Sequence, residues 1–257
     1  MTIKFENIAG ITIIANGIEL NYPFEICIHN MLDCCKKVFI CTDINNRDNT
    51  LEKLQSLQKE YENRLKIIQT EWDWTVNNGT DLAYQANICL NHVRQEKRFD
   101  GVLYLQADEI IKPENINYIQ RNFPLANFVF TRLYYWQDLN HIKQSWTMAL
   151  PRLCILTPDL KVVEDGMSMH VDHAAGQYIT IPVQECPIYH YSRIGNTKLI
   201  AKRLNVLDSL FHKTGTYTPL DNYTFGINNN FEQGADKQDI LNAPQQHPKG
   251  IREFYYD

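Results

Sequence analysis

The middle of the chain contains the segment Gly101-Val102-Leu103-Tyr104-Leu105-Gln106-Ala107-Asp108-Glu109, in which an apolar run ends at two carboxylates. A short, continuous apolar run of this kind is typical of a strand that is buried on both faces. A carboxylate just past such a strand is well placed to hold Mg²⁺ or Mn²⁺, which take oxygen ligands from carboxylates and substrate phosphates. Asp is also common in strand-end turns, so the segment alone leaves both interpretations open.

Strand-like and helix-like segments alternate on the N-terminal side of this segment. Each short apolar run is followed by a helical pattern, and these pairs cover residues 11–15 and 23–35, 38–41 and 51–65, and 67–68 and 80–96. Strands separated by helices of this length form a parallel sheet with helices on both faces. Ligands bind such sheets outside the carboxyl ends of the strands. We therefore expect Asn16, Asp43 and Asp108, which follow predicted strands, to lie at one edge of the sheet.

The second half of the chain changes in character. Strand candidates occur at 128–136, 151–156 and 179–183, and a helix is expected at 199–211. From residue 215 onward the chain is rich in Asn, Gln, Gly, Pro and Tyr. The sequence predicts one α/β domain over 1–214 and an irregular C-terminal extension over 215–257. We expect the extension to pack near the ligand-binding cleft and to help close over the donor or acceptor. The alternatives are a tail that only covers apolar surface and one that forms a dimer contact.

Composition narrows the possible functions. The net charge of the 257 residues is −5. A protein that holds nucleic acid by its phosphates usually shows a basic field, so this charge disfavours nucleic acid as a ligand. The seven cysteines form no CxxC pair and lie mostly in apolar runs, which predicts buried free thiols and a reducing compartment. His170-x-x-His173 without a cysteine pattern does not predict zinc. The sequence shows neither a signal peptide nor the ~18 apolar residues of a membrane span, so we expect a cytoplasmic protein.

Several short motifs occur in an order that resembles glycosyltransferase-family-2-like enzymes of the GT-A fold. The family's N-G-x-x-x-x-Y-P, D-x-x-x-D-G-T, L-Q-A-D-E and Y-H-Y segments are similar to residues 16–23, 43–50, 105–109 and 189–191, with Trp72 and Asn87 between them. The resemblance implies a GT-A-type, Rossmann-like, mostly parallel sheet flanked by helices. It also implies transfer of a sugar from a nucleotide-sugar to an acceptor hydroxyl, with a donor-binding half over 1–135 and an acceptor half over 136–214.

The resemblance implies a metal and diphosphate site. Asp108 is the expected metal ligand, His190 is expected to complete the metal shell, and the expected cofactors are Mn²⁺ or Mg²⁺ and a nucleotide-sugar donor, in the first place a UDP-sugar. Gln106 stands where most proteins of this fold carry Asp, and a neutral amide is a poorer metal ligand, so metal dependence stays open. Arg193 is expected to bind the diphosphate, because a guanidinium group matches phosphate oxygens.

The remaining donor-binding residues are expected to be Asn16, Asp43, Asp48 and Asn87. Carboxylates at 43 and 48 can accept hydrogen bonds from a base N–H or a ribose hydroxyl. Capping of the helix that begins near residue 50 is the alternative for Asp48.

An inverting transferase also needs a general base for the acceptor hydroxyl. The candidates are Glu164 and Asp165, with Asp172 as a further possibility, and an acidic turn before Gly166 is the structural alternative. Trp136 and Trp146 are either a stacking platform or core residues. His247 is a further candidate site residue.

Two other functions remain open at this point. A nucleotidyltransferase also uses strand-end carboxylates, but its loop after the first strand is usually rich in Gly or basic residues, unlike Asn16-Gly17-Ile18-Glu19. A non-catalytic protein that binds a nucleotide or glycan is the third possibility. The acceptor of a transferase is also open, and a glycan, a lipid-linked sugar, a protein or a modified base in viral DNA are the alternatives.

Overall fold

Four short strands form the parallel half of a large sheet. They are β1 (Ile8–Ile14), β2 (Lys37–Asp43), β3 (Leu65–Thr70) and β4 (Gly101–Tyr104), in the order β4-β1-β2-β3. Every position of β1 and β4 is buried, which explains why their sequences are apolar without alternation. The structure is a computed structural model that describes residues 4–75, 79–171, 177–211, 240–244 and 246–256.

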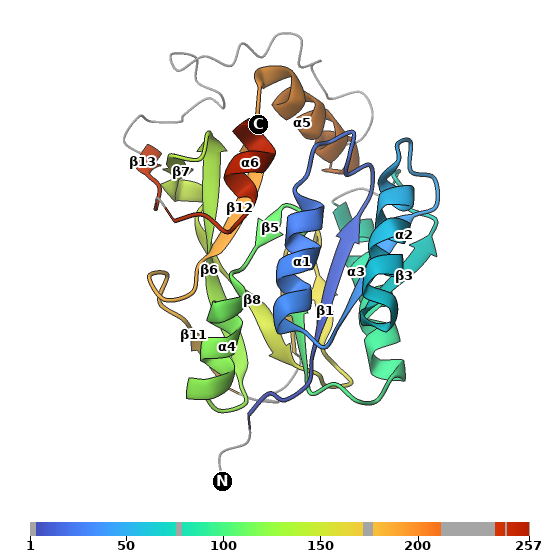
Figure 1. Cartoon of the computed structure of the whole chain (residues 1–257), viewed down its shortest axis with the longest axis vertical. Coiled ribbons are helices and arrows are strands. Elements are labelled where there is room, and N and C mark those ends of the chain that lie inside the picture. The colour runs from blue at the N-terminus through green and yellow to red at the C-terminus, as the bar shows by residue number, and fades with distance from the viewer. Residues whose placement is uncertain (1–3, 76–78, 172–176, 212–239, 245, 257) are drawn as a thin grey trace.

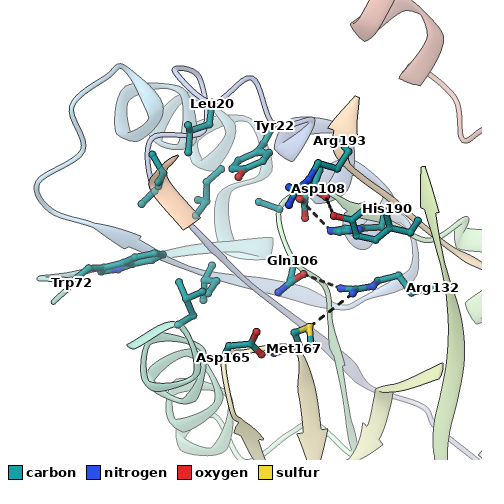
Figure 2. A pocket seen from close by; sticks show the side chains of 18 of the residues that line it. Leu20, Tyr22, Trp72, Gln106, Asp108, Arg132, Asp165, Met167, His190 and Arg193 are labelled. Carbon is teal, nitrogen blue, oxygen red and sulfur yellow. Dashed lines mark hydrogen bonds and ion pairs between the residues drawn. The ribbon is translucent and has the colours of Figure 1, made fainter. Parts of the chain in front are cut away.

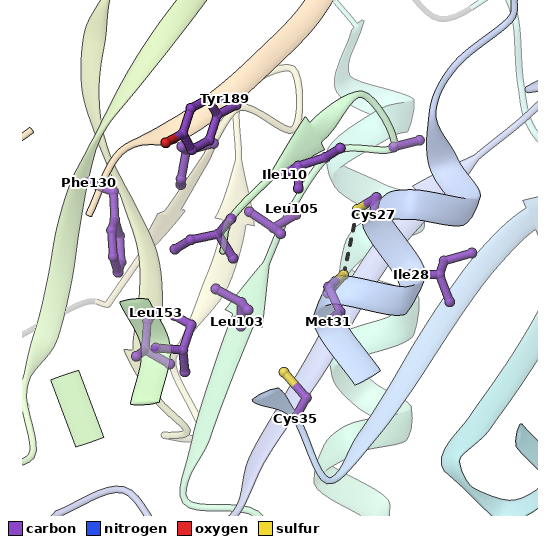
Figure 3. Packing of buried hydrophobic residues seen from close by; sticks show 14 of the residues in the cluster. Cys27, Ile28, Met31, Cys35, Leu103, Leu105, Ile110, Phe130, Leu153 and Tyr189 are labelled. Atoms are coloured by element: carbon purple, nitrogen blue, oxygen red, sulfur yellow. Dashed lines mark hydrogen bonds between the residues drawn. The ribbon is translucent and has the colours of Figure 1, made fainter. Parts of the chain in front are cut away.

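Helices cover both faces of this half of the sheet (Figure 1). One apolar cluster joins α1 (Phe24–Cys34) and α2 (Thr50–Tyr61) to Ile8 and Ile14 of β1, and the opposite cluster joins α3 (Thr80–Gln95) to Ile11. Figure 3 shows α1 of the first cluster packing toward β4. α1 packs closely on β1 at Gly10, where a Cβ would lie 2.8 Å from Cε of Met31, so a larger residue would require the methionine side chain to shift.

The second half of the chain extends the sheet through one reversed strand. β8 (Met148–Ile155) is antiparallel to both β4 and β6 (Asn127–Gln137), and β12 (Ile188–Ile194) is parallel to β6 and antiparallel to β5 (Glu109–Ile110). The predicted fold class is therefore confirmed: the protein has an α/β fold with a large, mostly parallel sheet flanked by helices.

Several elements were not predicted from the sequence. They are α4 (Pro113–Asn122), β7 (His141–Lys143), the antiparallel hairpin of β9 (Lys161–Val163) and β10 (Ser168–His170), and the short 3₁₀ helices Glu62–Arg64 and Gln144–Trp146. β11 (Tyr178–Thr180) corresponds to the strand expected over 179–183, and it adds to β6 in parallel. α5 (Thr197–Phe211) matches the predicted helix.

The C-terminal extension is more regular than predicted where it is described. β13 (Ile240–Asn242) pairs with β7, and α6 (Ile251–Tyr256) is a short helix beside β12 in Figure 1. Residues 212–239, which include the start of the predicted extension, lie outside the described residues. Among the described helices, none has the length and apolar character needed to cross a membrane.

Candidate active site

A cavity of about 300 Å³ opens at the carboxyl ends of β1 and β4 (Figure 2). Asp108, Arg132, His190 and Arg193 line one end of it, which we call the polar end, and Trp72 lies on the opposite side. The lining also includes the polar side chains of Gln106 and Asp165 and the apolar side chains of Ile13, Ile14, Leu20, Trp74 and Leu82. The size suits a small ligand, and the mixed lining suits a molecule that has both an anionic part and an apolar part.

The strand-end prediction holds for all three residues, but only one of them reaches the cavity. Asn16 and Asp43 follow or end the parallel strands β1 and β2, and Asp108 follows the neighbouring strand β4. Asp108 lines the cavity, whereas the other two are not among its lining residues. The three residues therefore share one edge of the sheet, but they differ in whether their side chains line the cavity.

Asp108 and His190 form a buried pair at the polar end. Oδ2 of Asp108 lies 3.4 Å from Nε2 of His190, and the two residues are 8% and 5% exposed. Burial tends to raise the pKa of Asp108, but His190, Arg203 and Arg132 together lower it, so the carboxyl group is ionised. Burial lowers the pKa of His190, and Arg132 adds to this effect against the opposing influence of Asp108, so we take the imidazole to be neutral.

This pair fits the expected metal. An ionised carboxylate and a neutral imidazole are both ligands for Mn²⁺ or Mg²⁺, and adjacent ligands of such an ion lie roughly 3 Å apart. Among the described residues, no group of three or more His, Cys, Asp or Glu side chains is arranged to hold a metal. A cation at Asp108 and His190 would thus depend on substrate phosphates and water for its other ligands, as Mg²⁺ commonly does.

Arg193 is buried beside this pair with unused hydrogen-bond donors. Its side chain is 7% exposed, and neither Nε nor Nη1 has a partner. The guanidinium group lies 5.8 Å from the ring centroid of Trp146, and Figure 2 shows it next to Asp108. Leaving buried N–H groups unpaired costs free energy, so this side chain is poised for an anionic ligand that enters the cavity.

Gln106 is held by a buried charge cluster below the cavity. Nη1 of Arg132 donates to Oε1 of Gln106 at 3.4 Å and to Oε1 of Glu109 at 3.2 Å. Glu109 also accepts from Nη2 of Arg152 at 2.6 Å and from the backbone N–H of Gln106 at 2.9 Å. Burial opposes ionisation of Glu109, but Arg152 and Arg132 lower its pKa. The amide oxygen of Gln106 is thus already engaged by Arg132.

The structure separates the two candidate bases. Asp165 lines the cavity, whereas Glu164 is exposed, has a positive φ of 59° and is not a lining residue. Burial raises the pKa of Asp165, Glu164 raises it further, and Arg132 and backbone hydrogen bonds oppose the shift. In Figure 2 Asp165 lies across the cavity from Asp108. Asp172 is outside the described residues.

Asn87 positions the hairpin that carries Asp165. Its Nδ2 donates to the backbone oxygen of Val162 at 2.8 Å, and its Oδ1 accepts from the backbone N–H of Val162 at 2.9 Å. Asn87, which belongs to α3, thus makes the same two hydrogen bonds to the backbone of β9 that a neighbouring strand would make. Asn87 does not line the cavity, so its predicted contact with the donor remains untested.

The other predicted donor-binding residues connect the loops around the cavity. Oδ1 of Asn16 accepts from the backbone N–H of Arg47 at 2.7 Å. Asp48 accepts from the backbone N–H of Glu19 at 2.6 Å and from that of Thr50 at 3.0 Å, so it joins two loops and supports the start of α2. These bonds fix the loops after β1 and β2 relative to one another. Direct contact of Asn16 or Asp48 with a donor stays a prediction.

Asp43 uses its carboxylate within the protein. Oδ1 accepts from the backbone N–H groups of Asn45 at 3.0 Å and Trp72 at 3.4 Å, and Oδ2 accepts from Nε1 of Trp74 at 2.8 Å. The side chain is 1% exposed. Asp43 therefore holds the two tryptophans that line the cavity, and the predicted contact between Asp43 and a nucleobase is not tested.

Arg203 of α5 fixes the roof of the cavity. It is fully buried, and its guanidinium group donates to the backbone oxygens of Leu20, Asn21, Tyr191, Ser192 and Ile194. These carbonyls belong to the loop after β1 and to β12. Because Leu20 and Val206 both line the cavity, this one side chain joins the three segments that close it from above.

Comparison with known proteins gives structural neighbours at low identity. No family model matches the chain, and no curated protein matches it. S. aureus TarS, solved with UDP, is 12% identical over 79% of this chain, with a TM-score of 0.39. GalNAc-T7, solved with UDP, GalNAc and Mn²⁺, is 10% identical over 79% of this chain, with a TM-score of 0.45.

The inositol-1-phosphate CTP transferase of T. maritima is a further neighbour, 7% identical over 81% of this chain and all of its own, with a TM-score of 0.41. The chain spans 64% of the TarS structure and 48% of the GalNAc-T7 structure. The neighbours therefore include glycosyltransferases and nucleotidyltransferases, and identities this low transfer neither a ligand nor an activity to this chain.

Sequence reasoning missed Trp74, Arg132 and the charge cluster of Glu109 and Arg152. Tryptophan at 74 follows Trp72 at a spacing of two, which is the signal that two neighbouring rings share one side of an extended segment. The arginines give no such signal, because arginine is mostly an exposed residue.

The other aromatic and histidine candidates do not line the cavity. Trp136 is 4% exposed in a small core cluster against which Trp146 packs, which agrees with the core alternative. His247 hydrogen-bonds to the hydroxyl of Tyr191 at 3.1 Å and to the backbone oxygen of Leu139 at 2.8 Å. The described part of the C-terminal extension thus packs behind β12, and none of its residues lines the cavity.

Proposed function

We propose that the protein is a nucleotide-sugar-dependent glycosyltransferase whose active site is the cavity at Asp108. The observation that supports this most directly is the combination, in one cavity, of the Asp108–His190 pair with a buried arginine whose donors are unused. Such a combination suits a diphosphate, which needs both a cation and directed N–H donors. The motif order that resembles glycosyltransferase-family-2-like enzymes points to a nucleotide-sugar.

In this proposal Asp165 is the general base. Its carboxylate takes the proton of the acceptor hydroxyl while the acceptor oxygen forms a bond to the anomeric carbon of the sugar and the bond to the diphosphate breaks. Its place across the cavity from Asp108 favours an inverting reaction, in which base and leaving group lie on opposite sides of the sugar. The donor half over 1–135 supplies Asp108, and the acceptor half over 136–214 supplies Asp165.

Arg193 binds the departing diphosphate and stabilises the negative charge that develops on it. A divalent cation held by Asp108 and His190 would neutralise further charge on the leaving group. Gln106, fixed by Arg132, lies between the two carboxylates and is a candidate for contact with the donor. The acceptor is a molecule with a free hydroxyl group, and we propose a glycan or another hydroxylated compound.

One observation bears on the nucleotidyltransferase alternative. Backbone amides of the loop after β1 are used inside the protein: Ile18 donates to Thr50, Glu19 to Asp48, Leu20 to Asn16 and Tyr22 to Gly17. A loop that cradles phosphates needs such amides free. This loop therefore favours the glycosyltransferase proposal.

The test is a screen of nucleotide-sugars for hydrolysis and transfer with Mg²⁺, with Mn²⁺ and with chelator. We expect Asp108→Asn and Asp165→Asn to lower the rate by at least about 100-fold, in the range of losing one charge-stabilising or acid–base group. Glu164→Gln, which changes the neighbouring carboxylate outside the cavity, is the matched control and should keep most activity. Release of pyrophosphate from a nucleoside triphosphate, or full activity of Asp108→Asn, would contradict the proposal.

A further inference from the structure

Arg132 lines the cavity with part of its guanidinium group weakly engaged. The residue is 4% exposed, and its Nη2 contacts the thioether sulfurs of Met148 at 3.5 Å and Met167 at 3.9 Å. Thioether sulfur is a weak hydrogen-bond acceptor. Within the described part of the chain, Nε of Arg132 has no partner. An oxygen anion in the cavity would replace the sulfur contacts of Nη2 with a charge-assisted hydrogen bond, which is much stronger.

The charge of Arg132 is only partly balanced inside the protein. Nη1 of Arg132 and Nη2 of Arg152 both donate to Oε1 of Glu109, at 3.2 and 2.6 Å, so the two guanidinium groups share one carboxylate. Arg152 is fully buried and does not line the cavity. The acidic residues that do line it are Asp108 and Asp165, and neither forms an ion pair with Arg132 in the described part of the chain. A ligand therefore meets a buried cation that lacks a full counter-charge.

Arg132 stands between the side chains that we assign to the two reaction partners. In Figure 2 its guanidinium group points toward Gln106 and Met167. Arg193 lies on one side of it, and Asp165 lies on the other. In the proposed function the diphosphate lies at Arg193 and the acceptor hydroxyl at Asp165. The transferred sugar then occupies the space between these two residues, which is the space that Arg132 faces.

We propose that the transferred sugar carries a carboxylate and that Arg132 binds this group, so that the donor is a nucleotide-linked uronic acid. The inference rests on the proposed function, since it assumes a nucleotide-sugar donor. A uronic acid differs from the neutral sugar by a carboxylate in place of a CH₂OH group, so it needs little additional room in the cavity. A neutral sugar could accept a hydrogen bond from Nη2 of Arg132, but it would leave the charge of the guanidinium group unbalanced.

The experiment compares equilibrium binding of UDP-glucuronate and UDP-glucose to the full chain by calorimetry. The two ligands differ only at the carboxylate. We expect the wild-type protein to bind UDP-glucuronate at least about tenfold more tightly, which is the effect of one charge-assisted hydrogen bond. Arg132→Gln should reduce this preference to less than about threefold by weakening UDP-glucuronate alone. The affinities of the variant for UDP-glucose and for UDP should stay within about threefold of the wild-type values.

Two further variants serve as controls. Arg132→Lys keeps the positive charge and should retain a preference of at least about threefold. Met148→Leu removes a sulfur contact of Arg132 at a residue that does not line the cavity, and it should leave the preference unchanged. Circular dichroism and thermal unfolding show whether each variant is folded. The comparison of the two ligands on the wild-type protein needs no variant, so it tests the inference even where Arg132→Gln does not fold.

Three results would overturn the inference. The first is a wild-type preference for UDP-glucuronate below about tenfold. The second is an unchanged preference in folded Arg132→Gln, which would place the carboxylate elsewhere. The third is equal weakening of both ligands and of UDP by Arg132→Gln, which would assign Arg132 to the diphosphate. A protein that binds both nucleotide-sugars without preference and transfers a neutral sugar would leave the proposed function intact, whereas binding of neither ligand would reject both.

Discussion

At the scale of single residues, buried guanidinium groups dominate the site. Arg132, Arg152, Arg193 and Arg203 are all at most 7% exposed. The buried carboxylates among them, Asp108 and Glu109, supply fewer negative charges. Burying a charge without a partner is costly, so this excess of positive charge is retained at a cost in stability. An anionic ligand is the natural counter-charge.

Arg193 provides the sharpest test of this balance. We expect Arg193→Met to weaken UDP binding by more than about tenfold, because a charge-assisted contact is lost. The same change should raise the free energy of unfolding of the ligand-free protein by about 1–3 kcal/mol, because buried N–H groups without partners disappear. Calorimetric binding and chemical denaturation measure the two effects. Loss of both affinity and stability would show that Arg193 has a structural partner in the free protein.

Asp165 leads to a prediction about pH. Its pKa is raised, first by burial and also by Glu164. A base must be ionised, so activity should fall as the pH decreases through this raised pKa, above the usual range of an aspartate. Glu164→Gln removes a nearby negative charge and should move the acidic limb of the kcat profile to lower pH, with little change at neutral pH. An acidic limb that does not move in Glu164→Gln would argue against Asp165 as the titrating group.

At the scale of elements, the hairpin β9–β10 depends on α3 for its position. Asn87→Ala removes both hydrogen bonds to Val162. We expect a loss of stability of about 1–3 kcal/mol, because the backbone groups of Val162 lose partners in a half-buried place. The hairpin leads to Asp165, so kcat should fall while the KM for the donor changes little. A larger rise in KM than fall in kcat would instead support direct contact between Asn87 and the donor.

The sequence predicts the elements that have a clear period and misses those that depend on neighbours distant in the chain. The apolar runs of β1, β2 and β4 and the helical patterns of α1 and α3 are local signals, and the structure contains them. α4 is the exception, because it begins at a proline, a helix-start signal, and Ile116 and Ile119 give it a one-sided apolar pattern that local signals could have predicted.

The same limit applies to the candidate site. Asp108, His190 and Arg193 come together because β4 and β12 both end at the cavity, and motif order was enough to suggest this. The bond from Trp74 to Asp43 joins residues 31 positions apart. No local pattern shows that the carboxylate of Asp43 holds both tryptophans, so a sequence-based prediction could not include these bonds.

At the scale of the whole molecule, the end of the chain contributes to the core. Ile251 is fully buried, and Leu139 donates its backbone N–H to the hydroxyl of Tyr256 at 3.2 Å. We expect removal of residues 246–257 to lower the free energy of unfolding by more than about 3 kcal/mol, since it uncovers apolar surface and breaks hydrogen bonds. Thermal unfolding of the shortened chain measures this. An unchanged Tm would mean that the tail is only loosely attached.

β12 has different neighbours on its two sides. His190 and Ser192 face the cavity, while Tyr189 and Tyr191 pack against Tyr135 and the His247 ring. A strand is one covalent ribbon, so restraint applied to one side reduces fluctuations on the other. Occupancy of the cavity should therefore slow amide hydrogen exchange in α6 as well as in β12, and the energetic linkage must be mutual. The last helix would then report, from outside the site, whether a donor is bound.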